Sequence, residues 1–344
     1  MDFHCVSLYL SANNRKQSVA LNGLVQIGFS CVTLKNQSMK KILIAGGTGF
    51  VGTTLIKHLN NCGYNVNVLT RRNNTSSTEN IRYFEWDTEN GFIDESAFDG
   101  VTKIINLTGA NIAEKRWTEK RKVEIIESRK KAIDLLFRYV KTNNFRIDIF
   151  ISSSASGYYG AITTGKIFTE ESDNGNDFLA SVCGEWEKSA PQFESLGVTT
   201  VILRKGAVLG KDGGMYQKLA PLAKLGINTS LGSGRQYLPW IDIRDLVRLY
   251  EFILKTNEIS GVFNAVSSEH ISMNDFSKAL LQSFGKTSFL PNAPAFLVKL
   301  FLGEMSVMLL NGSRVSNEKI KKAGFKFEYN SITESIPGKE FDEP

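Results

Sequence analysis

The chain has 344 residues, of which 42% are hydrophobic and 22% charged, a composition typical of a globular protein. Its formal net charge is +6, but the basic residues are spread out and lack the interleaved aromatic residues of a nucleic-acid platform. No apolar stretch reaches the length of a membrane span. We therefore expect neither a nucleic-acid partner nor a membrane partner.

The cysteines and histidines predict neither disulfides nor a metal site. The four cysteines have no metal-ligand spacing and no disulfide framework, which favours a reducing compartment and a cytoplasmic location. The three histidines are scattered along the chain. We therefore expect no metal ion.

Residues 1–38 show no clear hydrophobic period, and we expect them to be a disordered or spurious extension that is dispensable for the fold. Asp2 is their only acidic residue, which gives them a weak likeness to an organelle transit peptide. However, Arg15, Lys16 and Lys35 are few positive charges for such a peptide. The alternative is a natural start at Met39, directly before the first predicted strand.

The first predicted strand, residues 40–45, leads into a glycine turn and then a helical stretch, residues 53–59. The glycines of the turn allow a tight bend, a close backbone approach to a pyrophosphate and close packing of the helix on the strand. The helix N-terminus would offer unpaired N–H groups and a positive dipole end to phosphates. With the second apolar strand, residues 64–70, the pattern predicts a dinucleotide site. A tight turn without a ligand is the other interpretation. The predicted cofactor contacts are Gly46, Thr48, Gly49, Phe50, Val51 and Gly52.

The end of the second strand indicates which dinucleotide binds. A site for NAD usually has an acidic residue there for the ribose 2′-hydroxyl. This chain instead has Arg71 and Arg72, whose planar guanidinium groups suit a 2′-phosphate. We therefore predict NADP over NAD, with two solvated arginines as the alternative.

The alternation of strands and helices continues along the chain. Further strands are predicted at residues 81–86, 101–107, 147–152 and 199–204, and helices at residues 118–142 and 178–196. This order predicts an α/β fold with a Rossmann-type doubly wound parallel sheet. The apolar stretch 295–310, interrupted by Lys299 and Glu304, predicts a buried or amphipathic helix.

Ligands of doubly wound sheets bind at the carboxyl ends of the strands. Several predicted strands of this chain have polar or glycine residues there, so these ends are candidate site positions, although such residues are also common in ordinary turns. The candidate positions at these strand ends are Asp87, Asn106, Leu107, Thr108, Gly109 and Ser154.

Motifs spread over residues 39–335 carry a family resemblance. They include the segments 46–52, 106–112, 154–160, 175–179, 234–236, 240–242 and 323–327. Together they resemble the extended short-chain dehydrogenase/reductases of the epimerase/dehydratase superfamily, and more narrowly the atypical "epimerase family protein" branch with a C-terminal domain of unknown function.

The resemblance implies an NADP-binding Rossmann domain, residues 39–265, and a smaller C-terminal α/β lobe, residues 266–344. Part of residues 205–240 would join this lobe in covering a substrate cleft. The resemblance also implies that Asp87 lies near the adenine, and that Asn106, Leu107 and Thr108 line the nicotinamide ribose side.

One departure from the family concerns catalysis. Typical members carry Tyr-x-x-x-Lys on the helix after the fifth strand, and the lysine lowers the tyrosine pKa for proton transfer. In this chain Leu179 and Cys183 occupy those positions. Ser154 matches the family's serine, so Ser154 and Tyr158 are the remaining catalytic candidates. Cys183 is predicted to pack in the core rather than to act as a nucleophile.

A turn-rich loop, residues 232–240, supplies candidate substrate contacts. Arg235 would suit an anionic small-molecule substrate, and Trp240 would form a wall of its pocket. A structural loop with a surface arginine is the alternative. The first hypothesis is therefore an NADP-dependent epimerase or oxidoreductase acting on a small or nucleotide-linked substrate. A homodimer is one assembly that this hypothesis allows. The second hypothesis is a non-catalytic NADP-binding sensor or scaffold.

Overall fold

The computed structural model describes residues 41–71, 77–256 and 259–336. All of them belong to Ser38–Pro344, the second of the two units into which the chain divides. The predictions for residues 1–38, for Met39 and for Arg72 lie outside the described residues. None of the described helices is long and apolar enough to cross a membrane.

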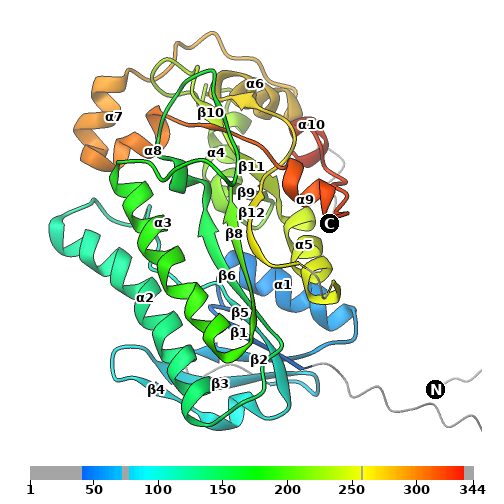
Figure 1. Cartoon of the computed structure of the whole chain (residues 1–344). Helices are drawn as coiled ribbons and strands as arrows, with labels where there is room; N and C mark the ends of the chain where they lie inside the picture. The colour runs from blue at the N-terminus through cyan, green and yellow to red at the C-terminus, as the bar shows by residue number, and fades with distance from the viewer. Residues whose placement is uncertain (1–40, 72–76, 257–258, 337–344) are drawn as a thin grey trace, which may run out of the picture. The chain divides into compact units, whose positions relative to one another are not determined.

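An eight-stranded sheet forms the centre of this unit (Figure 1). Its strands lie in the order β12-β8-β6-β5-β1-β2-β3-β4, and every neighbouring pair is parallel except β3 and β4. The order grows outward from β1 in both directions, so the predicted doubly wound sheet is confirmed, with its switch point between β1 and β5. The bounds are β1 (Lys41–Ala45), β2 (Asn65–Thr70), β3 (Ile81–Asp87), β4 (Phe92–Ile93), β5 (Val101–Asn106), β6 (Ile149–Ala155), β8 (Thr199–Lys205) and β12 (Gly261–Ala265).

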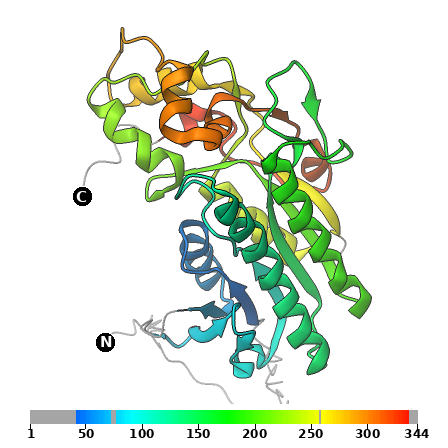
Figure 2. The same ribbon diagram turned by 90° about the vertical axis from the view of Figure 1, so that its left-hand side faces the viewer.

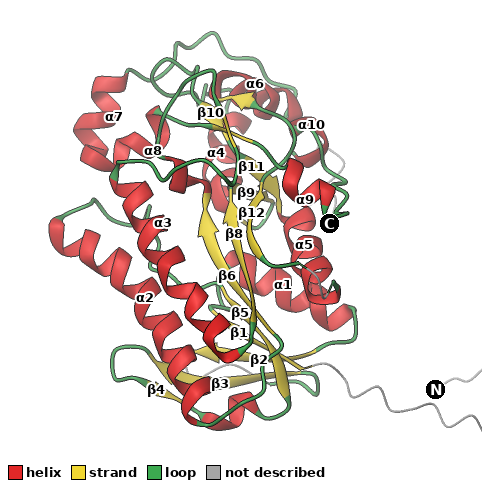
Figure 3. Ribbon diagram, in the orientation of Figure 1, coloured by secondary structure: helices red, strands yellow, loops and turns green. Residues whose placement is uncertain are grey.

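Helices cover both faces of the sheet (Figures 1 and 3). Helices α1 (Phe50–Asn61) and α5 (Ile243–Lys255) pack on one face, and α2 (Glu119–Thr142) and α3 (Phe178–Ser189) pack on the other. Ile42 and Ile44 of β1 contact the first layer, whereas Leu43 contacts the second, because successive strand side chains point to opposite faces.

Two element ends differ from the prediction. Helix α3 stops at Ser189 and continues as a 3-10 helix, Ala190–Leu196. Pro191 lies at the start of this segment and has no N–H to donate to the preceding turn, which favours a break there. Strand β6 runs to Ala155, three residues beyond the predicted end, and so includes Ser154.

Most of the smaller elements follow β8. Helices α6, α7 and α8 lie beyond the end of β6 in both views (Figures 1 and 2). The predicted division at residues 265 and 266 stays a prediction, although β12 ends at Ala265. The helices are α4 (Gly214–Lys224), α6 (Met273–Ser283), α7 (Ala295–Leu302), α8 (Val307–Leu310), α9 (Glu318–Lys322) and α10 (Ile332–Ser335). The short strands pair as β7 (Ile167–Phe168) with β14 (Arg314–Val315), β9 (Ala207–Gly210) with β11 (Trp240–Asp242), and β10 (Tyr237–Leu238) with β13 (Ile271–Ser272). Short 3-10 turns span Glu95–Phe98, Ser156–Tyr159 and Gly303–Ser306.

The apolar stretch 295–310 is not one helix. Helix α7 ends at Leu302, followed by Gly303, whose φ of 60° lies in the left-handed region, and a 3-10 turn separates α7 from α8. Only Val298 of α7 is buried, while Phe296 and Phe301 are exposed. The prediction of one buried or amphipathic helix over residues 295–310 is therefore wrong in its length, and the buried alternative is wrong for α7.

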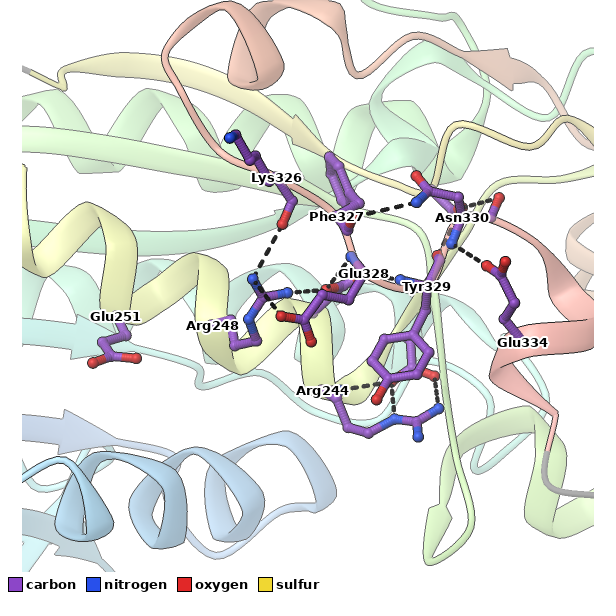
Figure 4. A network of polar contacts seen from close by, with 12 residues as sticks. Arg244, Arg248, Glu251, Lys326, Phe327, Glu328, Tyr329, Asn330 and Glu334 are labelled. Atoms are coloured by element: carbon purple, nitrogen blue, oxygen red, sulfur yellow. Dashed lines mark hydrogen bonds and ion pairs between the residues drawn. The ribbon is translucent and has the colours of Figure 1, made fainter.

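Buried Asp245 of α5 fastens the C-terminal segment to the helix layer. Its carboxylate accepts the backbone N–H groups of Glu328 at 3.0 Å and Tyr329 at 2.9 Å. Arg248 lies beside it, with Nη1 at 2.6 Å from the Asp245 carboxylate, and its Nη2 donates to the Lys326 carbonyl at 3.2 Å (Figure 4). The segment that follows α9 is thus held by hydrogen bonds to α5, a helix that packs on the central sheet.

Candidate functional site

The glycine turn lies at the switch point, between β1 and α1. Gly46 has a φ of 81°, and a Cβ added there would lie 2.9 Å from the backbone of Leu107 and Thr108. A Cβ on Gly52 would lie 2.6 Å from the Gly46 carbonyl oxygen. The fold itself therefore requires glycine at positions 46 and 52.

Gly49 differs, because neither its backbone nor its packing requires glycine. Its φ of −85° and ψ of 173° suit any residue, and among the described residues the atom nearest to an added Cβ is the Gly46 carbonyl oxygen at 3.8 Å. Gly49 is the N-cap of α1, and no side chain caps the N–H groups there. The first turn of α1 also carries no acidic residue. The backbone without a side chain at Gly49, the uncapped N–H groups of the first turn of α1 and the positive end of the α1 dipole together suit an anionic ligand such as a pyrophosphate.

Asn106 ends β5 beside this turn and has an unpaired donor. The residue is fully buried, and its Oδ1 accepts hydrogen bonds from the backbone N–H and the hydroxyl of Thr108. Its Nδ2 has no hydrogen-bond partner in the described part of the chain. An unsatisfied buried amide costs about 1–3 kcal/mol. A ligand oxygen between β1 and β5 would satisfy it.

Arg71 and Asp87 lie at the carboxyl ends of the adjacent strands β2 and β3. The Asp87 carboxylate accepts hydrogen bonds from Asn90 and from the N–H of Glu89, and these bonds, with the nearby charge of Arg71, lower its pKa. Arg71 is exposed. The predicted partner Arg72 lies outside the described residues. The carboxyl edge of the sheet therefore carries an exposed guanidinium at the end of β2, near the carboxylate at the end of β3.

Ser154 is at the carboxyl end of β6, but its hydroxyl points into the interior. It is fully buried and donates to Glu187 Oε1 of α3 at 2.6 Å. Glu187 also pairs with Arg204 of β8, with contacts of 2.9 Å and 2.8 Å. The hydroxyl belongs to a buried ion-pair network, so this geometry does not support the predicted role in proton transfer.

Arg204 also contacts both tyrosines that follow β6, Tyr158 and Tyr159. Its guanidinium lies 3.4 Å from the centroid of the Tyr158 ring, and its Nη1 donates to the Tyr159 hydroxyl at 3.0 Å. That hydroxyl donates to Asn264 Oδ1 at 2.7 Å, and burial raises the pKa of Tyr159 to about 12. The half-buried Tyr158 hydroxyl has no hydrogen bond within the described residues. Its proposed catalytic role stays a prediction.

Apolar packing fills the positions of the missing tyrosine and lysine. Leu179, like Met305, packs against a buried cluster that includes Trp117 and Val182. Cys183 is buried, as predicted, and burial raises the pKa of its thiol to about 12. A thiol that stays protonated at neutral pH is a poor nucleophile.

The loop 232–240 presents only one of its two predicted substrate contacts. Arg235 is exposed, and its guanidinium makes no hydrogen bond or ion pair with any described residue. Trp240 is only 1% exposed and packs in a core cluster with Leu209 and Phe276. The prediction of a substrate wall at Trp240 is therefore wrong, since β11 turns this side chain into the core.

Sequence reasoning missed Lys205, the last residue of β8. Its Nζ donates to Ser153 Oγ at 3.0 Å, and that oxygen lies 3.0 Å from the Tyr250 hydroxyl. Burial, and after it the charge of Arg129, lower the pKa of the half-buried Lys205 to about 8. The signal in the sequence was a lysine at the carboxyl end of an apolar strand, where polar site residues gather.

One cluster in the described part of the chain has metal-ligand atoms close together. These atoms, from His58, Cys62 and Glu251, lie within 4.8 Å of one another. However, the ammonium of Lys255 lies 2.5 Å from Glu251, and His58 lies 2.8 Å from the same carboxylate. Because Lys255 already neutralises Glu251, the cluster is explained as an ion pair within α5 that also makes a hydrogen bond to His58 of α1.

Comparisons with known families and proteins give consistent matches. The NAD dependent epimerase/dehydratase family matches residues 42–265, and a domain of unknown function, DUF1731, matches residues 293–336. An epimerase family protein of Staphylococcus saprophyticus is 35% identical over 300 residues, covering 86% of this chain and 97% of that protein. Epimerase family protein YfhF of Bacillus subtilis is 32% identical over 292 residues, covering 85% of this chain and 95% of the relative.

Solved structures share the fold. Human epimerase family protein SDR39U1 (isoform 2), crystallised with NADPH, has a TM-score of 0.75 and 26% identity, covering 86% of this chain and 97% of the human one. A nucleoside-diphosphate sugar epimerase from Corynebacterium glutamicum has a TM-score of 0.69 and 27% identity, covering 87% of this chain and 57% of that one. The UDP-glucose 4-epimerase of Thermus thermophilus, in complex with NAD, has a TM-score of 0.68 at 18% identity, covers 86% of this chain and 97% of that one, and supports the fold alone.

Proposed function

Because the chain belongs to the NAD dependent epimerase/dehydratase family, we propose that it binds NADP at the carboxyl edge of its sheet, between β1 and β5. The observation that carries this proposal is Gly49, a glycine that the free chain does not need and a pyrophosphate would. The unpaired Asn106 Nδ2 provides a second place for a ligand oxygen. The NADPH bound to the human relative supports a nicotinamide cofactor for this chain.

Each part of the dinucleotide has a proposed contact. The pyrophosphate would lie on the turn 46–52, the 2′-phosphate near Arg71 and Arg72, and the adenine near Asp87. The nicotinamide ribose would lie along the segment 106–109, with Asn106 Nδ2 as a donor. The arrangement follows the sheet edge from β3 to β5, the direction that doubly wound folds use for dinucleotides.

The proposed activity is that of an NADP-dependent epimerase or oxidoreductase on a small or nucleotide-linked substrate. When bound, the cofactor supplies hydride exchange at its nicotinamide ring. The exposed Arg235, with no partner among the described residues, is a candidate contact for an anionic group of the substrate. The free cysteines Cys62 and Cys183 are compatible with the cytoplasmic location that we propose.

A second function, a non-catalytic NADP-binding sensor or scaffold, is favoured by the replaced residues. Leu179 and Cys183 cannot supply the usual proton transfer, and Ser154 is bound to Glu187. Transfer of deuterium from C4-deuterated NADPH to a panel of aldehydes, ketones and nucleotide sugars separates the two functions. Transfer to any member supports the enzyme, whereas tight NADP binding without transfer supports the sensor.

Changing Arg71 and Arg72 together to alanine should weaken NADP⁺ binding by about 1–3 kcal/mol for each lost charge-assisted contact. NAD⁺ binding should change little, because NAD⁺ lacks the 2′-phosphate that these guanidinium groups would hold. Calorimetric titration of the unmodified protein and of this double variant, each with NADP⁺ and with NAD⁺, measures the effect.

Arg82→Ala is the matched control for this pair. Arg82 is also exposed, but it stands at the amino-terminal end of β3, away from the proposed site. Its loss should leave both affinities unchanged. Binding of NAD⁺ by the unmodified protein as tightly as NADP⁺ would contradict the proposed preference.

A further inference from the structure

We propose that Lys205 holds the proton that moves at the nicotinamide end of the site, in the role that the missing tyrosine has in typical relatives. This inference rests on the proposed NADP function. It follows from the place of Lys205 in the sheet, from its hydrogen-bond partners and from the charges around it.

Lys205 stands on the same edge of the sheet as the proposed cofactor contacts. It ends β8 and is paired with Ala155 of β6 and Ala265 of β12. Because β8, β6, β5 and β1 are parallel neighbours, their carboxyl ends meet at one edge. Two strand spacings, about 10 Å, separate β8 from β5, where Asn106 would contact the nicotinamide ribose.

The contacts of Lys205 leave donors available for a ligand. An ammonium group has three N–H donors, and Lys205 uses one of them for Ser153 Oγ at 3.0 Å. Ser153 Oγ lies 3.0 Å from the hydroxyl of Tyr250, a fully buried residue of α5. Burial raises the pKa of Tyr250, so this hydroxyl fixes Ser153 and does not take the proton from Lys205.

The charges near Lys205 favour release of its proton. No carboxylate forms an ion pair with it among residues 41–71, 77–256 and 259–336. The charged group whose field reaches it is Arg129 of α2, itself buried. Burial first, and then this like charge, lower the pKa of Lys205 to about 8. A proton donor whose pKa lies near the working pH can both give and regain its proton, which an ordinary lysine with a pKa of about 10.4 does poorly.

The proton step balances in both directions. In reduction, hydride supplied by the cofactor reaches a substrate carbonyl carbon, and the C=O π electron pair moves onto the oxygen. That oxygen takes the proton from Lys205 Nζ as the N–H bond breaks, leaving a neutral amine that regains a proton from solvent. In oxidation, the neutral amine accepts the hydroxyl proton, and the hydride leaves for the oxidised cofactor.

A titration of protein labelled with ¹³C at the lysine ε-carbons tests the placement of Lys205 without relying on activity. We expect one lysine resonance that titrates near pH 8, is lost in Lys205→Met, and shifts its midpoint by at least about half a pH unit at saturating NADP⁺. Lys103→Met is the control. Lys103 is a buried strand lysine that donates to the Leu254 carbonyl, near the amino end of β5, and its variant should keep the resonance.

Each outcome of that titration is decisive for one of the two proposals. If calorimetry shows NADP⁺ binding but the Lys205 resonance does not respond to it, the role of Lys205 is overturned and the cofactor proposal stands. If the unmodified protein binds no NADP⁺, the proposed function fails and the role of Lys205 fails with it. Lys205→Met removes only a half-buried charge, so its melting temperature should equal or exceed that of the unmodified protein.

Deuterium transfer from C4-deuterated NADPH to the substrate panel tests the proton step itself. Lys205→Met should transfer deuterium at least about 10²-fold more slowly than the unmodified protein. Lys205→Arg should be similarly slow, because arginine keeps the charge but does not release its proton. Both variants should retain NADP⁺ affinity within about fivefold, about 1 kcal/mol. Undiminished transfer by Lys205→Met, or no transfer by the unmodified protein, would overturn the role of Lys205.

Discussion

Replacing Glu187 with alanine should lower the free energy of unfolding by about 3–5 kcal/mol, because it leaves a buried charge without its partner. Arg204 is only 3% exposed at its side chain and makes two contacts with the Glu187 carboxylate. The same carboxylate accepts the buried hydroxyl of Ser154. One substitution therefore removes the acceptors of Arg204 Nε and Nη2 and of the Ser154 hydroxyl, between β6, β8 and α3.

Denaturant unfolding of a small set of variants measures this effect. Glu187→Gln keeps an acceptor for Ser154 and should lose less stability than Glu187→Ala. Replacing Glu187 and Arg204 together with methionine removes both charges and should recover much of the loss, since no buried charge then remains unpaired. Glu318→Ala breaks the more exposed pair with Lys321 and should cost only about 0–1 kcal/mol. A loss below about 1 kcal/mol for Glu187→Ala would contradict the buried network.

Ser154→Ala separates the two interpretations of this serine. As a member of the buried network it should lose about 1.5–3 kcal/mol of stability, the usual value of a hydrogen bond to a charged group. As a proton-transfer group it should slow deuterium transfer by about 10²-fold or more without unfolding the protein. The observed contact with Glu187 favours the first result.

The sequence was sufficient to predict the parts of the fold that depend on local patterns. The strand, glycine turn and helix of residues 41–61 follow one another as predicted, and β2, β3, β5 and β8 lie within one residue of the predicted strand bounds. The order of the sheet follows from right-handed crossovers between such units. The family matches over residues 42–265 and 293–336 confirm the resemblance inferred from the motifs.

The orientation of the site residues could not be predicted, because one residue of strand alternation decides which face a side chain occupies. Ser153 faces Tyr250 of α5, whereas Ser154 faces Glu187 of α3. Both serines follow the same apolar run and both are buried, so the pattern does not show which one faces Glu187 and which one faces Tyr250. Lys205 meets Ser153 across 52 positions of sequence, a contact that no local motif encodes.

Gly49→Ala and Gly52→Ala should have different effects, and the difference tests the cofactor site. At position 49 an alanine Cβ meets no atom of the described residues closer than 3.8 Å, so the free protein should lose at most about 1 kcal/mol, because alanine is a poorer N-cap than glycine. The same Cβ would occupy the space through which a pyrophosphate approaches the backbone. NADP⁺ affinity should therefore fall at least about tenfold, or about 1.4 kcal/mol.

At position 52 the added Cβ would lie 2.6 Å from the backbone of both Gly46 and Gly47, so the turn and α1 must move apart. Gly52→Ala should lose about 1–3 kcal/mol of stability, the usual cost of overpacking, together with its NADP⁺ affinity. Thermal unfolding of the free variants and calorimetry with NADP⁺ distinguish the two glycines. If Gly49→Ala binds NADP⁺ as tightly as the unmodified protein, the space beside Gly49 is not where the pyrophosphate lies, and the proposed site loses its main support.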